Sequence, residues 1–315
     1  MSGFAQEPFR VLFYNVENLF DPIDDPATRD DAYTPAGRKR WTQERCRAKI
    51  DGLARVLRDA ELPAVVGLAE VETRGVLETL VAHPAVAAAD YRIVHFDSPD
   101  ERGIDVALLY RSDRFAVAGC APVRTAVPSE PPLRTRDLLT VWGRVAGEPL
   151  FFVVLHAPSR RGGAAASAFR RIAVCEQVRR LVDSVARRDP ATKIVVAGDF
   201  NDDPIDRSLC EALGACGSLR ELPAGALYNP FVALFKAGYG TLAYGGEWNL
   251  FDQILLSPNL VRGEGLRLHG EAMIFSPPDL FERRGRDRGT PFRTYAGNRY
   301  NGGYSDHFPV FVDLE

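Results

Sequence analysis

Side chains that could do chemistry stand beside the ends of apolar runs in this sequence. They are carboxylates, amides and imidazoles: Asn15, Glu17, Glu70, His156, Asp199, Asn201, Asp252, Asp306 and His307. An isolated ionised carboxylate within a buried strand is costly, so such groups should be paired, bound to a metal or placed at a wet strand end. Because residues i and i+2 of an extended segment project to the same side, we expect Asn15 with Glu17, and Asp199 with Asn201, each to aim two oxygens at one point.

This donor set indicates metal-dependent chemistry on a phosphoester. Carboxylate and amide oxygens suit Mg²⁺ or Mn²⁺, which are hard cations. Such an ion would polarise a phosphoryl oxygen and stabilise a leaving alkoxide. The imidazoles of His156 and His307 are suited to hydrogen-bonding a phosphate oxygen or to transferring a proton. With two candidate histidines and no thiolate cluster, a zinc site is disfavoured.

The apolar runs predict the elements that would position these groups. Nine short runs, rich in valine, isoleucine, leucine and phenylalanine, are typical of strands: residues 9–15, 64–70, 91–96, 104–110, 138–145, 150–156, 193–200, 250–257 and 308–314. Helices are expected between them, over residues 43–62, 74–82, 167–188 and 204–213, the last capped by Asp203. The alternation predicts an α/β or α+β fold with covered sheets, whose strand ends would line a ligand crevice.

The composition is that of an ordinary globular protein and excludes disordered and collagen-like chains. Of 315 residues, 46% are apolar and 26% are charged, and the net charge of −3 gives no general attraction to nucleic acid. The five cysteines, an odd number without a CxxC pair, are typical of a reducing compartment. We find neither a signal peptide nor a transmembrane helix, and we expect a cytoplasmic protein with one domain over residues 1–315.

Residues 279–304 differ in composition from the rest of the chain. They hold six arginines against three acids, a local charge of +3, which leaves −6 for the remainder. A stretch rich in glycine and arginine is typical of a long loop, and long loops in compact domains are often functional.

Six segments resemble, in the same order, the motifs of the endonuclease/exonuclease/phosphatase, or DNase I-like, superfamily. They are NVENLFD (15–21), GLAEVE (67–72), VVLHAPSRRGG (153–163), GDFND (198–202), FDQILLS (251–257) and SDHFPV (305–310). Each motif alone is weak, but their common order covers nearly the whole chain. The resemblance implies an α/β (α+β) four-layer sandwich, in which two mixed β-sheets lie face to face, flanked by helices, with the active site at one edge of the sheets.

The resemblance also implies roles for the polar residues. Glu70 would be the principal metal ligand, and three further residues would lie near the ion: Asn15, Glu17 and Asp306. Asp199 would orient or deprotonate the attacking water, and Asn201 would position the phosphate. The phosphate would lie between two imidazoles. His307 would contact the scissile phosphate and be oriented by Asp252. His156 would contact the phosphate from the other side, and Asp105 falls where some members of the superfamily carry an acidic partner for this histidine.

Five further residues are candidates for contact with the substrate: Arg160, Arg161, Arg293, Tyr295 and Trp248. Arg160 and Arg161 could grip a phosphate bidentately, or they could form a solvated basic turn. For the other three, contact with substrate and packing within the protein are both open.

We therefore expect a Mg²⁺- or Mn²⁺-dependent hydrolase of phosphodiester bonds. A nuclease, either endonuclease or exonuclease, is the first hypothesis because an arginine-rich stretch precedes the SDH motif, so nucleic acid is a candidate partner. A phosphodiesterase or phosphatase acting on a lipid, an inositol phosphate or another small phosphoester is the alternative, and a non-catalytic binding module is a minor one. The sequence looks most like a bacterial branch of the superfamily marked by NVENLFD, which leaves the substrate open.

Overall fold

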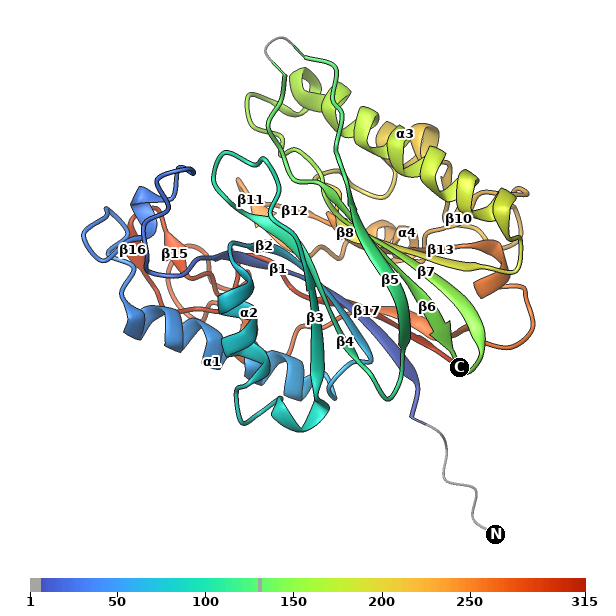
Figure 1. The fold of residues 1–315 in the computed structure, drawn as a ribbon. Coiled ribbons are helices and arrows are strands. Elements are labelled where there is room, and N and C mark those ends of the chain that lie inside the picture. Colours follow the sequence, from blue (N-terminus) through green and yellow to red (C-terminus); the bar gives the residue numbers. More distant parts are fainter. Residues whose placement is uncertain (1–6, 130–131) are drawn as a thin grey trace.

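The computed structural model describes residues 7–129 and 132–315, and these form two large sheets with helices outside (Figure 1). The first sheet has the strand order β14–β17–β1–β2–β4–β3. Its strands are β1 (Phe9–Leu19), β2 (Val65–Val71), β3 (Tyr91–His95), β4 (Asp105–Arg111), β14 (Leu268–Ile274) and β17 (Val310–Leu314).

The second sheet has the order β5–β6–β7–β8–β13–β10–β9. Its strands are β5 (Ala116–Val123), β6 (Leu138–Val145), β7 (Glu148–His156), β8 (Lys193–Asp199), β9 (Ala215–Cys216), β10 (Leu227–Tyr228) and β13 (Asp252–Leu256). Two small hairpins complete the strands: β11 (Leu242–Tyr244) with β12 (Glu247–Asn249), and β15 (Tyr295–Ala296) with β16 (Arg299–Tyr300). Both large sheets are mixed, with parallel pairs β1–β2 and β7–β8 at their centres.

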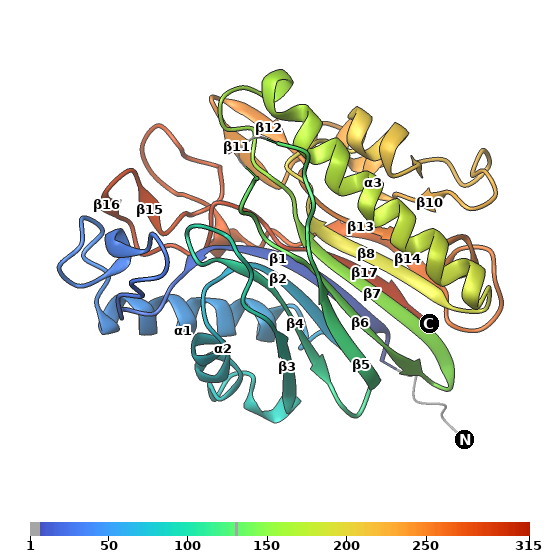
Figure 2. The same ribbon diagram turned by 45° about the horizontal axis from the view of Figure 1, so that its top comes forward.

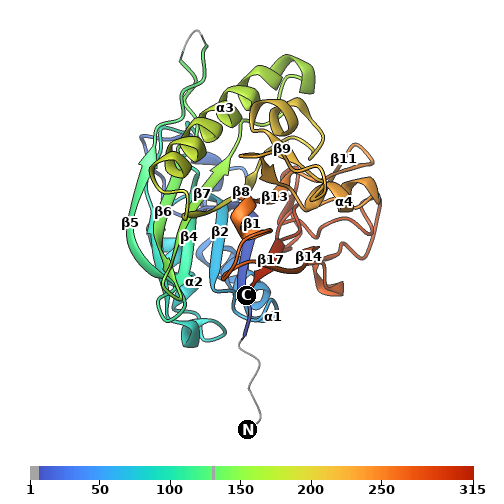
Figure 3. The same cartoon turned by 90° about the vertical axis from the view of Figure 1, so that its right-hand side faces the viewer.

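Alternation along the strands divides the core into three layers of side chains. In β1, Val11 and Phe13 lie in the core between the sheets, whereas Leu12 and Tyr14 lie in the core under the first pair of helices. A third core lies between the second sheet and a long helix, and includes Val153 of β7. The structure is therefore the expected four-layer sandwich, helix–sheet–sheet–helix, as the side view shows with α3 (Ala164–Arg188) above and α1 (Gln43–Asp59) below the strands (Figure 3).

The helices cover the outer faces of the sheets. They are α1 (Gln43–Asp59), α2 (Arg74–Val81), α3 (Ala164–Arg188) and the short α4 (Phe231–Lys236). In α1, Cys46, Ile50, Leu53 and Leu57 are buried against the first sheet, as their spacing of three and four predicts. The N-cap hydroxyl of Thr42 accepts a hydrogen bond from the backbone N–H of Arg45, which satisfies one of the free donors at the helix start.

Three sequence expectations about local structure differ from the fold. No helix begins at Asp203: a single π-helical turn covers Ser208–Ala212, because Oδ1 of Asp203 accepts the N–H of Leu250 instead of capping the next turn. Strands β5 and β14 were missed, since both are half-exposed and poor in long apolar runs. Residues 279–304 are not one continuous loop, because they contain the β15–β16 hairpin.

One end of the sandwich collects the ends of strands from both sheets. His156 and Asp199 are partners at the carboxyl ends of β7 and β8, and Asp252 at the start of β13 pairs with Asp199. The hairpins β11–β12 and β15–β16 lie at this end, opposite the C-terminal end of β17 (Figure 2). Among the described residues, no helix is long and apolar enough to span a bilayer.

Candidate active site

Asp199, the last residue of β8, joins groups from both sheets. Its Oδ2 accepts a hydrogen bond from Nδ2 of Asn15 at 3.0 Å, and its Oδ1 accepts the N–H of Asn201 at 2.9 Å. Nε2 of His156 lies 3.5 Å from the same Oδ2. Burial and the charge of Asp252 raise the pKa of Asp199 to about 7, although His307 and the hydrogen bonds act to lower it. The side chain is 2% exposed, so this carboxyl group is positioned rather than mobile.

His307 precedes β17 and is held by Asp252. Nδ1 of His307 lies 2.6 Å from Oδ2 of Asp252, which is fully buried. Burial acts to lower the pKa of His307, but the carboxylates of Asp252, Asp199 and Asp306 outweigh it, so the pKa lies well above its ordinary value. The surrounding carboxylates therefore favour the protonated form of the imidazole. Its Nε2, 4.0 Å from Oδ1 of Asp306, is the nitrogen left for another partner.

Backbone strain is concentrated at this end of the sheets. Glu17, Asn18, Glu70 and Asn201 have φ values of 49°, 54°, 66° and 50°. Non-glycine residues rarely adopt this left-handed region, because each such conformation costs on the order of 1–3 kcal/mol and persists only where the surrounding structure holds it. Such strain clusters at functional sites, where it aims side chains that a regular strand would not.

The strained backbone also contradicts the expectation that Asn15 with Glu17, and Asp199 with Asn201, each aim two oxygens at one point. The strand does not alternate regularly after Asn15, so Asn15 reaches Asp199 while the carboxylate of Glu17 reaches the backbone N–H groups of Thr294 and Tyr295, at 2.6 and 3.2 Å. Asn201 likewise turns away from Asp199, and its Nδ2 donates to the carbonyl of Ala157. Neither pair therefore behaves as two extended neighbours on one face.

Glu17 faces a buried lysine that the sequence analysis missed. Nζ of Lys49, on α1, donates to the carbonyls of Glu17 and Tyr304 and to Oγ1 of Thr294, at 3.2, 2.5 and 2.5 Å. Burial lowers the pKa of Lys49 to about 8, against the charges of Glu17, Asp306 and Glu70. The signal in the sequence was a lysine on the apolar face of α1, one position before Ile50.

Three predicted metal ligands act on the pKa of this lysine through their charges, and two of them also lie near an arginine: Glu70 near Arg102 and Asp306 near Arg293. Burial and the charge of Asp306 raise the pKa of Glu17 to about 7. Oε2 of Glu70 accepts the N–H of Asn18 at 2.8 Å, and Oε1 lies 3.9 Å from Nη1 of Arg102. Carboxylate oxygens fit a divalent hard cation, which would compete with these basic groups for them. Both oxygens of Glu17 already accept backbone hydrogen bonds, so Glu70 and Asp306 have more free donor capacity.

A second group near the site also offers metal ligands. Asp199, Asp252 and His307 each offer one ligand atom, and the three atoms lie within 4.8 Å of one another. Because Asp252 and His307 are already hydrogen-bonded to each other, we regard the two as a charge pair. Oδ1 of Asp252 has no hydrogen-bond partner among the residues described.

The two adjacent arginines that were predicted to contact substrate differ in their surroundings. The guanidinium of Arg160 is engaged by Asp202, Asp203 and Asp206, with N–O distances of 3.1, 3.2 and 2.6 Å. Arg161, next to it, is exposed.

The other candidates lie closer to the His307 side. Nη2 of Arg293 lies 3.1 Å from Oδ2 of Asp306. The ring of Tyr295 is buried, and its hydroxyl donates to the carbonyl of Lys39. Trp248, 39% exposed, stacks on Phe308 with 6.1 Å between ring centroids.

Asp105 lies beside a different histidine from the one expected. Its Oδ2 is 3.6 Å from Nε2 of His95, and its Oδ1 accepts the N–H of Ser98 at 3.0 Å. Nδ1 of His156 is buried without a hydrogen-bond partner among the described residues. Instead of an acid, the buried Arg136 supports this strand end, because it donates to the carbonyls of His156 and Ala157. No signal in the sequence distinguished Arg136 from the other arginines.

Comparisons with known structures agree on the fold. The chain is similar to a humanized TDP2 from D. rerio (TM-score 0.61, 15% identity, 98% of this chain and 100% of that chain covered). It is also similar to the human Nocturnin catalytic domain with a bound sulfate (0.60, 17%, 99% and 95%) and to the mannosyl-6-phosphatase Bt3783 of Bacteroides thetaiotaomicron VPI-5482 (0.59, 16%, 98% and 99%). No curated protein matches the chain by sequence.

A sequence model of the endonuclease/exonuclease/phosphatase family matches residues 10–315, nearly the whole chain. That span includes every polar residue described above, from Asn15 to His307. Members of this family are phosphoesterase hydrolases, generally dependent on a divalent metal. By this match the chain belongs to the endonuclease/exonuclease/phosphatase family.

Proposed function

We propose that this protein is a Mg²⁺- or Mn²⁺-dependent phosphoesterase that hydrolyses phosphodiester bonds, with a nucleic acid as the first candidate substrate. The observation that carries the proposal is the buried network in which Asp199 and His307 lie between the strand ends of both sheets. Such an arrangement would supply a positioned base and a positioned proton donor close to one reacting phosphate.

The chain's own residues divide the work of an in-line attack by water. Asp199 orients the water and accepts its proton, and Asn15 and the N–H of Asn201 keep the carboxylate in place. The positively charged His307, held by Asp252, and the neutral His156, whose pKa burial lowers well below its ordinary value, donate to phosphate oxygens. Asn201 positions the phosphate.

Glu70 and Asp306, with Asn15 and Glu17 beside them, would hold the metal ion. When bound, Mg²⁺ or Mn²⁺ would polarise a phosphoryl oxygen and neutralise the charge that develops on it. The strained backbone at Glu70 is consistent with a side chain aimed at the ion, whereas both oxygens of Glu17 already accept backbone hydrogen bonds.

Exposed arginines support nucleic acid as the substrate. Arg283, Arg284, Arg286 and Arg288 are all exposed. The segment that carries them is anchored near His307, because the ring of Phe281 packs on Phe308 with centroids 4.8 Å apart. A TDP2 from D. rerio with 16% identity and a TM-score of 0.59 was solved with a single-strand DNA product. Clustered arginines of this kind contact the phosphates along a nucleic-acid strand.

A small phosphoester is the second candidate, since the mannosyl-6-phosphatase has nearly the same structural similarity to this chain. The NVENLFD, HxPSRRGG and FRTYxGxxYxGGYSDHFP patterns favour a bacterial branch for the chain and are compatible with either substrate class.

A substrate panel with Mg²⁺ or Mn²⁺ tests the proposal. It would contain plasmid, single-stranded DNA, abasic duplex, RNA, sphingomyelin, inositol phosphates and bis-p-nitrophenyl phosphate, with the His307→Ala variant as the control. We expect turnover that depends on the metal and is lost in the variant. Binding without turnover of any phosphoester would contradict an enzymatic role and favour a binding module.

The salt dependence of binding separates the two substrate classes. A protein that neutralises several phosphates loses affinity steeply as salt rises. We expect such a fall for DNA, and a smaller one after Arg286→Ala and Arg288→Ala together. Rapid turnover of a small phosphoester with weak, salt-insensitive DNA binding would favour the second candidate.

A further inference from the structure

The ends of β3 and β4 bring together three potential metal ligands that the catalytic proposal does not use as a group. His95 is the last residue of β3, Asp97 follows two residues later, and Asp105 begins β4. One ligand atom of each lies within 4.8 Å of the ligand atoms of the other two. The two strands are antiparallel neighbours at the edge of the first sheet.

The imidazole of His95 has no hydrogen-bond partner for its buried nitrogen. Its side chain is 2% exposed, and no described residue forms a hydrogen bond with Nε2. The nearest carboxylate oxygen, Oδ2 of Asp105, is 3.6 Å away, too far for a hydrogen bond. A buried polar atom left in this way costs about 1–3 kcal/mol unless something binds it.

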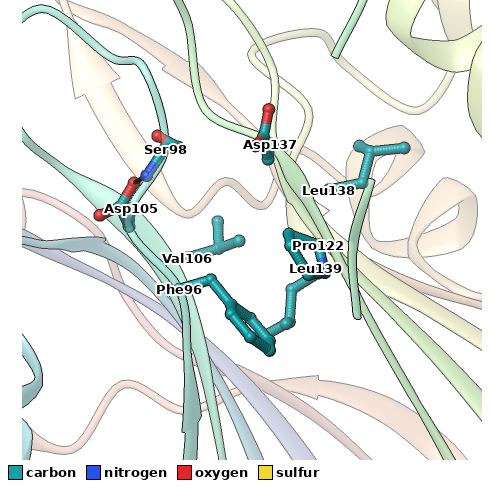
Figure 4. A pocket seen from close by; sticks show the side chains of 8 residues that line it. All are labelled: Phe96, Ser98, Asp105, Val106, Pro122, Asp137, Leu138 and Leu139. Carbon is teal, nitrogen blue, oxygen red and sulfur yellow. Dashed lines mark hydrogen bonds between the residues drawn. The ribbon is translucent and has the colours of Figure 1, made fainter. Parts of the chain in front are cut away.

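The spacing fits two ligands of one metal ion better than a direct contact. Around a tetrahedral ion, ligand atoms at about 2.1 Å from the metal are roughly 3.4 Å apart, close to the separation between His95 and Asp105. Oδ1 of Asp105 accepts the N–H of Ser98, which orients the carboxylate (Figure 4). The other oxygen, Oδ2, is the one that lies 3.6 Å from Nε2 of His95. Asp97 is exposed, so an ion would have access from solvent.

We propose that His95, Asp97 and Asp105 bind a transition-metal dication such as Zn²⁺. A ligand set of one imidazole nitrogen with carboxylate oxygens favours Zn²⁺ or a similar ion over Mg²⁺ and Ca²⁺, which prefer oxygen ligands alone. One ligand, Asp105, lies on β4, the strand next to β2, and pairs with Val71, the residue after Glu70. The other strand ligand, His95, lies one strand further along the sheet, on β3.

The segment between these ligands reaches the catalytic region. It carries Arg102, whose Nη1 lies 3.9 Å from Oε1 of Glu70, and Asp100, which pairs with Arg136 at 2.9 Å. A bound ion would tie both ends of this segment to the sheet. We therefore expect it to stabilise the fold around Arg102 without contacting the substrate.

Zinc titration of the whole chain tests the site by calorimetry and thermal unfolding. The protein would first be stripped with a chelator and then titrated with Zn²⁺ in excess Mg²⁺. Asp97→Asn is the test variant because the residue is exposed, and Asp90→Asn, an exposed aspartate beside the other end of β3, is the matched control. We expect one Zn²⁺ equivalent and a raised Tm in the wild type and in Asp90→Asn. In Asp97→Asn, the affinity for Zn²⁺ should fall at least roughly 10- to 100-fold. That is the usual cost of losing a residue that only supports a metal ligand, and Asp97 is proposed as a ligand itself.

The Glu70→Gln variant distinguishes this site from the proposed catalytic metal site. Retention of the Zn²⁺ equivalent in Glu70→Gln, with its loss in Asp97→Asn and His95→Gln, would support the proposal whatever the protein's activity. Equal Zn²⁺ affinity in the wild type and Asp97→Asn would overturn it. So would a Zn²⁺ equivalent that Glu70→Gln alone removes, or no Zn²⁺ binding by the wild type.

Discussion

Nδ1 of His307 and Oδ2 of Asp252 are 2.6 Å apart, and Asp252 is fully buried. The two residues come from different sheets, because Asp252 begins β13 and His307 stands just before β17. Their contact therefore depends on how the two sheets pack, and it determines that Nε2 is the ring nitrogen left free. A carboxylate held against one nitrogen leaves the other nitrogen as the donor toward substrate.

Removal of the imidazole should abolish most of the activity. We predict that His307→Ala lowers kcat on the order of 10²–10⁴-fold, the usual span for a positioned acid or base. Asp252→Asn should lower kcat less and leave KM nearly unchanged, because it disturbs the charge and orientation of the ring but leaves the ring in place. Steady-state kinetics on the best substrate of the panel measure both, and turnover by His307→Ala within about threefold of the wild type would refute its role.

Asp199 is expected to be as sensitive as His307. Asp199→Ala should lower kcat on the order of 10²–10⁴-fold, since it removes the group that orients and deprotonates the water. Asn15→Ala serves as the comparison: it leaves the carboxylate but removes its hydrogen bond of 3.0 Å, so a smaller loss is expected. Circular dichroism of each variant checks that the fold persists. An Asp199→Ala enzyme with nearly normal kcat would place the base elsewhere.

The architecture and the general position of the site follow from local patterns. Apolar runs marked the central strands of both sheets within a residue or two, because these strands are buried on both faces, except that β1 continues four residues beyond its run, to Leu19. The polar residue at the end of each run was informative for the same reason, since Asp199 is tolerated in a buried strand only where partners surround it.

What local patterns could not predict are contacts that cross the fold. Lys49 reaches Thr294 over a separation of 245 residues, and its burial depends on where α1 packs. The partner of Asp105 depends on the register of β3 with β4. The conformation of Glu17 and Glu70, at positive φ, is imposed by tertiary contacts against the intrinsic preference of glutamate.

Lys49 should be important for stability because its buried charge favours the ionised form of the buried Glu17 carboxyl. Lys49→Met removes this nearby charge and the hydrogen bonds to Thr294 and Tyr304, and we predict a loss of about 3–5 kcal/mol in the free energy of unfolding. The double variant Lys49→Met/Glu17→Gln should lose less than the sum of the two single changes, because neither charge is then left alone. Urea denaturation in metal-free buffer measures the cycle. Strict additivity would show that the two side chains are not coupled.

Two adjacent arginines should behave differently although their chemistry is the same. Arg160 is paired with three aspartates and lies over the ring of Phe251 at 4.4 Å, so Arg160→Ala should lower the free energy of unfolding by about 1–3 kcal/mol. Arg161 is exposed, so Arg161→Ala should change stability by less than about 0.5 kcal/mol and raise KM. Denaturation and kinetics on both variants separate structure from substrate contact. A normal KM in Arg161→Ala would show that Arg161 does not contact the substrate and is a solvated residue of the turn.

The cysteines should react with alkylating reagents in an order set by burial. Burial raises the pKa of Cys46 to about 11 and that of the buried Cys175 further, whereas Cys120 is exposed. Because the thiolate is the nucleophile, Cys46 should stay protonated and unreactive near pH 8, and its labelling should rise only as the pH approaches 11 or the chain unfolds. Mass spectrometry after brief exposure to iodoacetamide locates the label, and Cys120→Ser should remove the fastest reaction. Labelling of Cys46 at the rate of Cys120 under native conditions would mean that the packing of α1 opens readily, since the Sγ of Cys46 is buried against the carbonyl of Phe20.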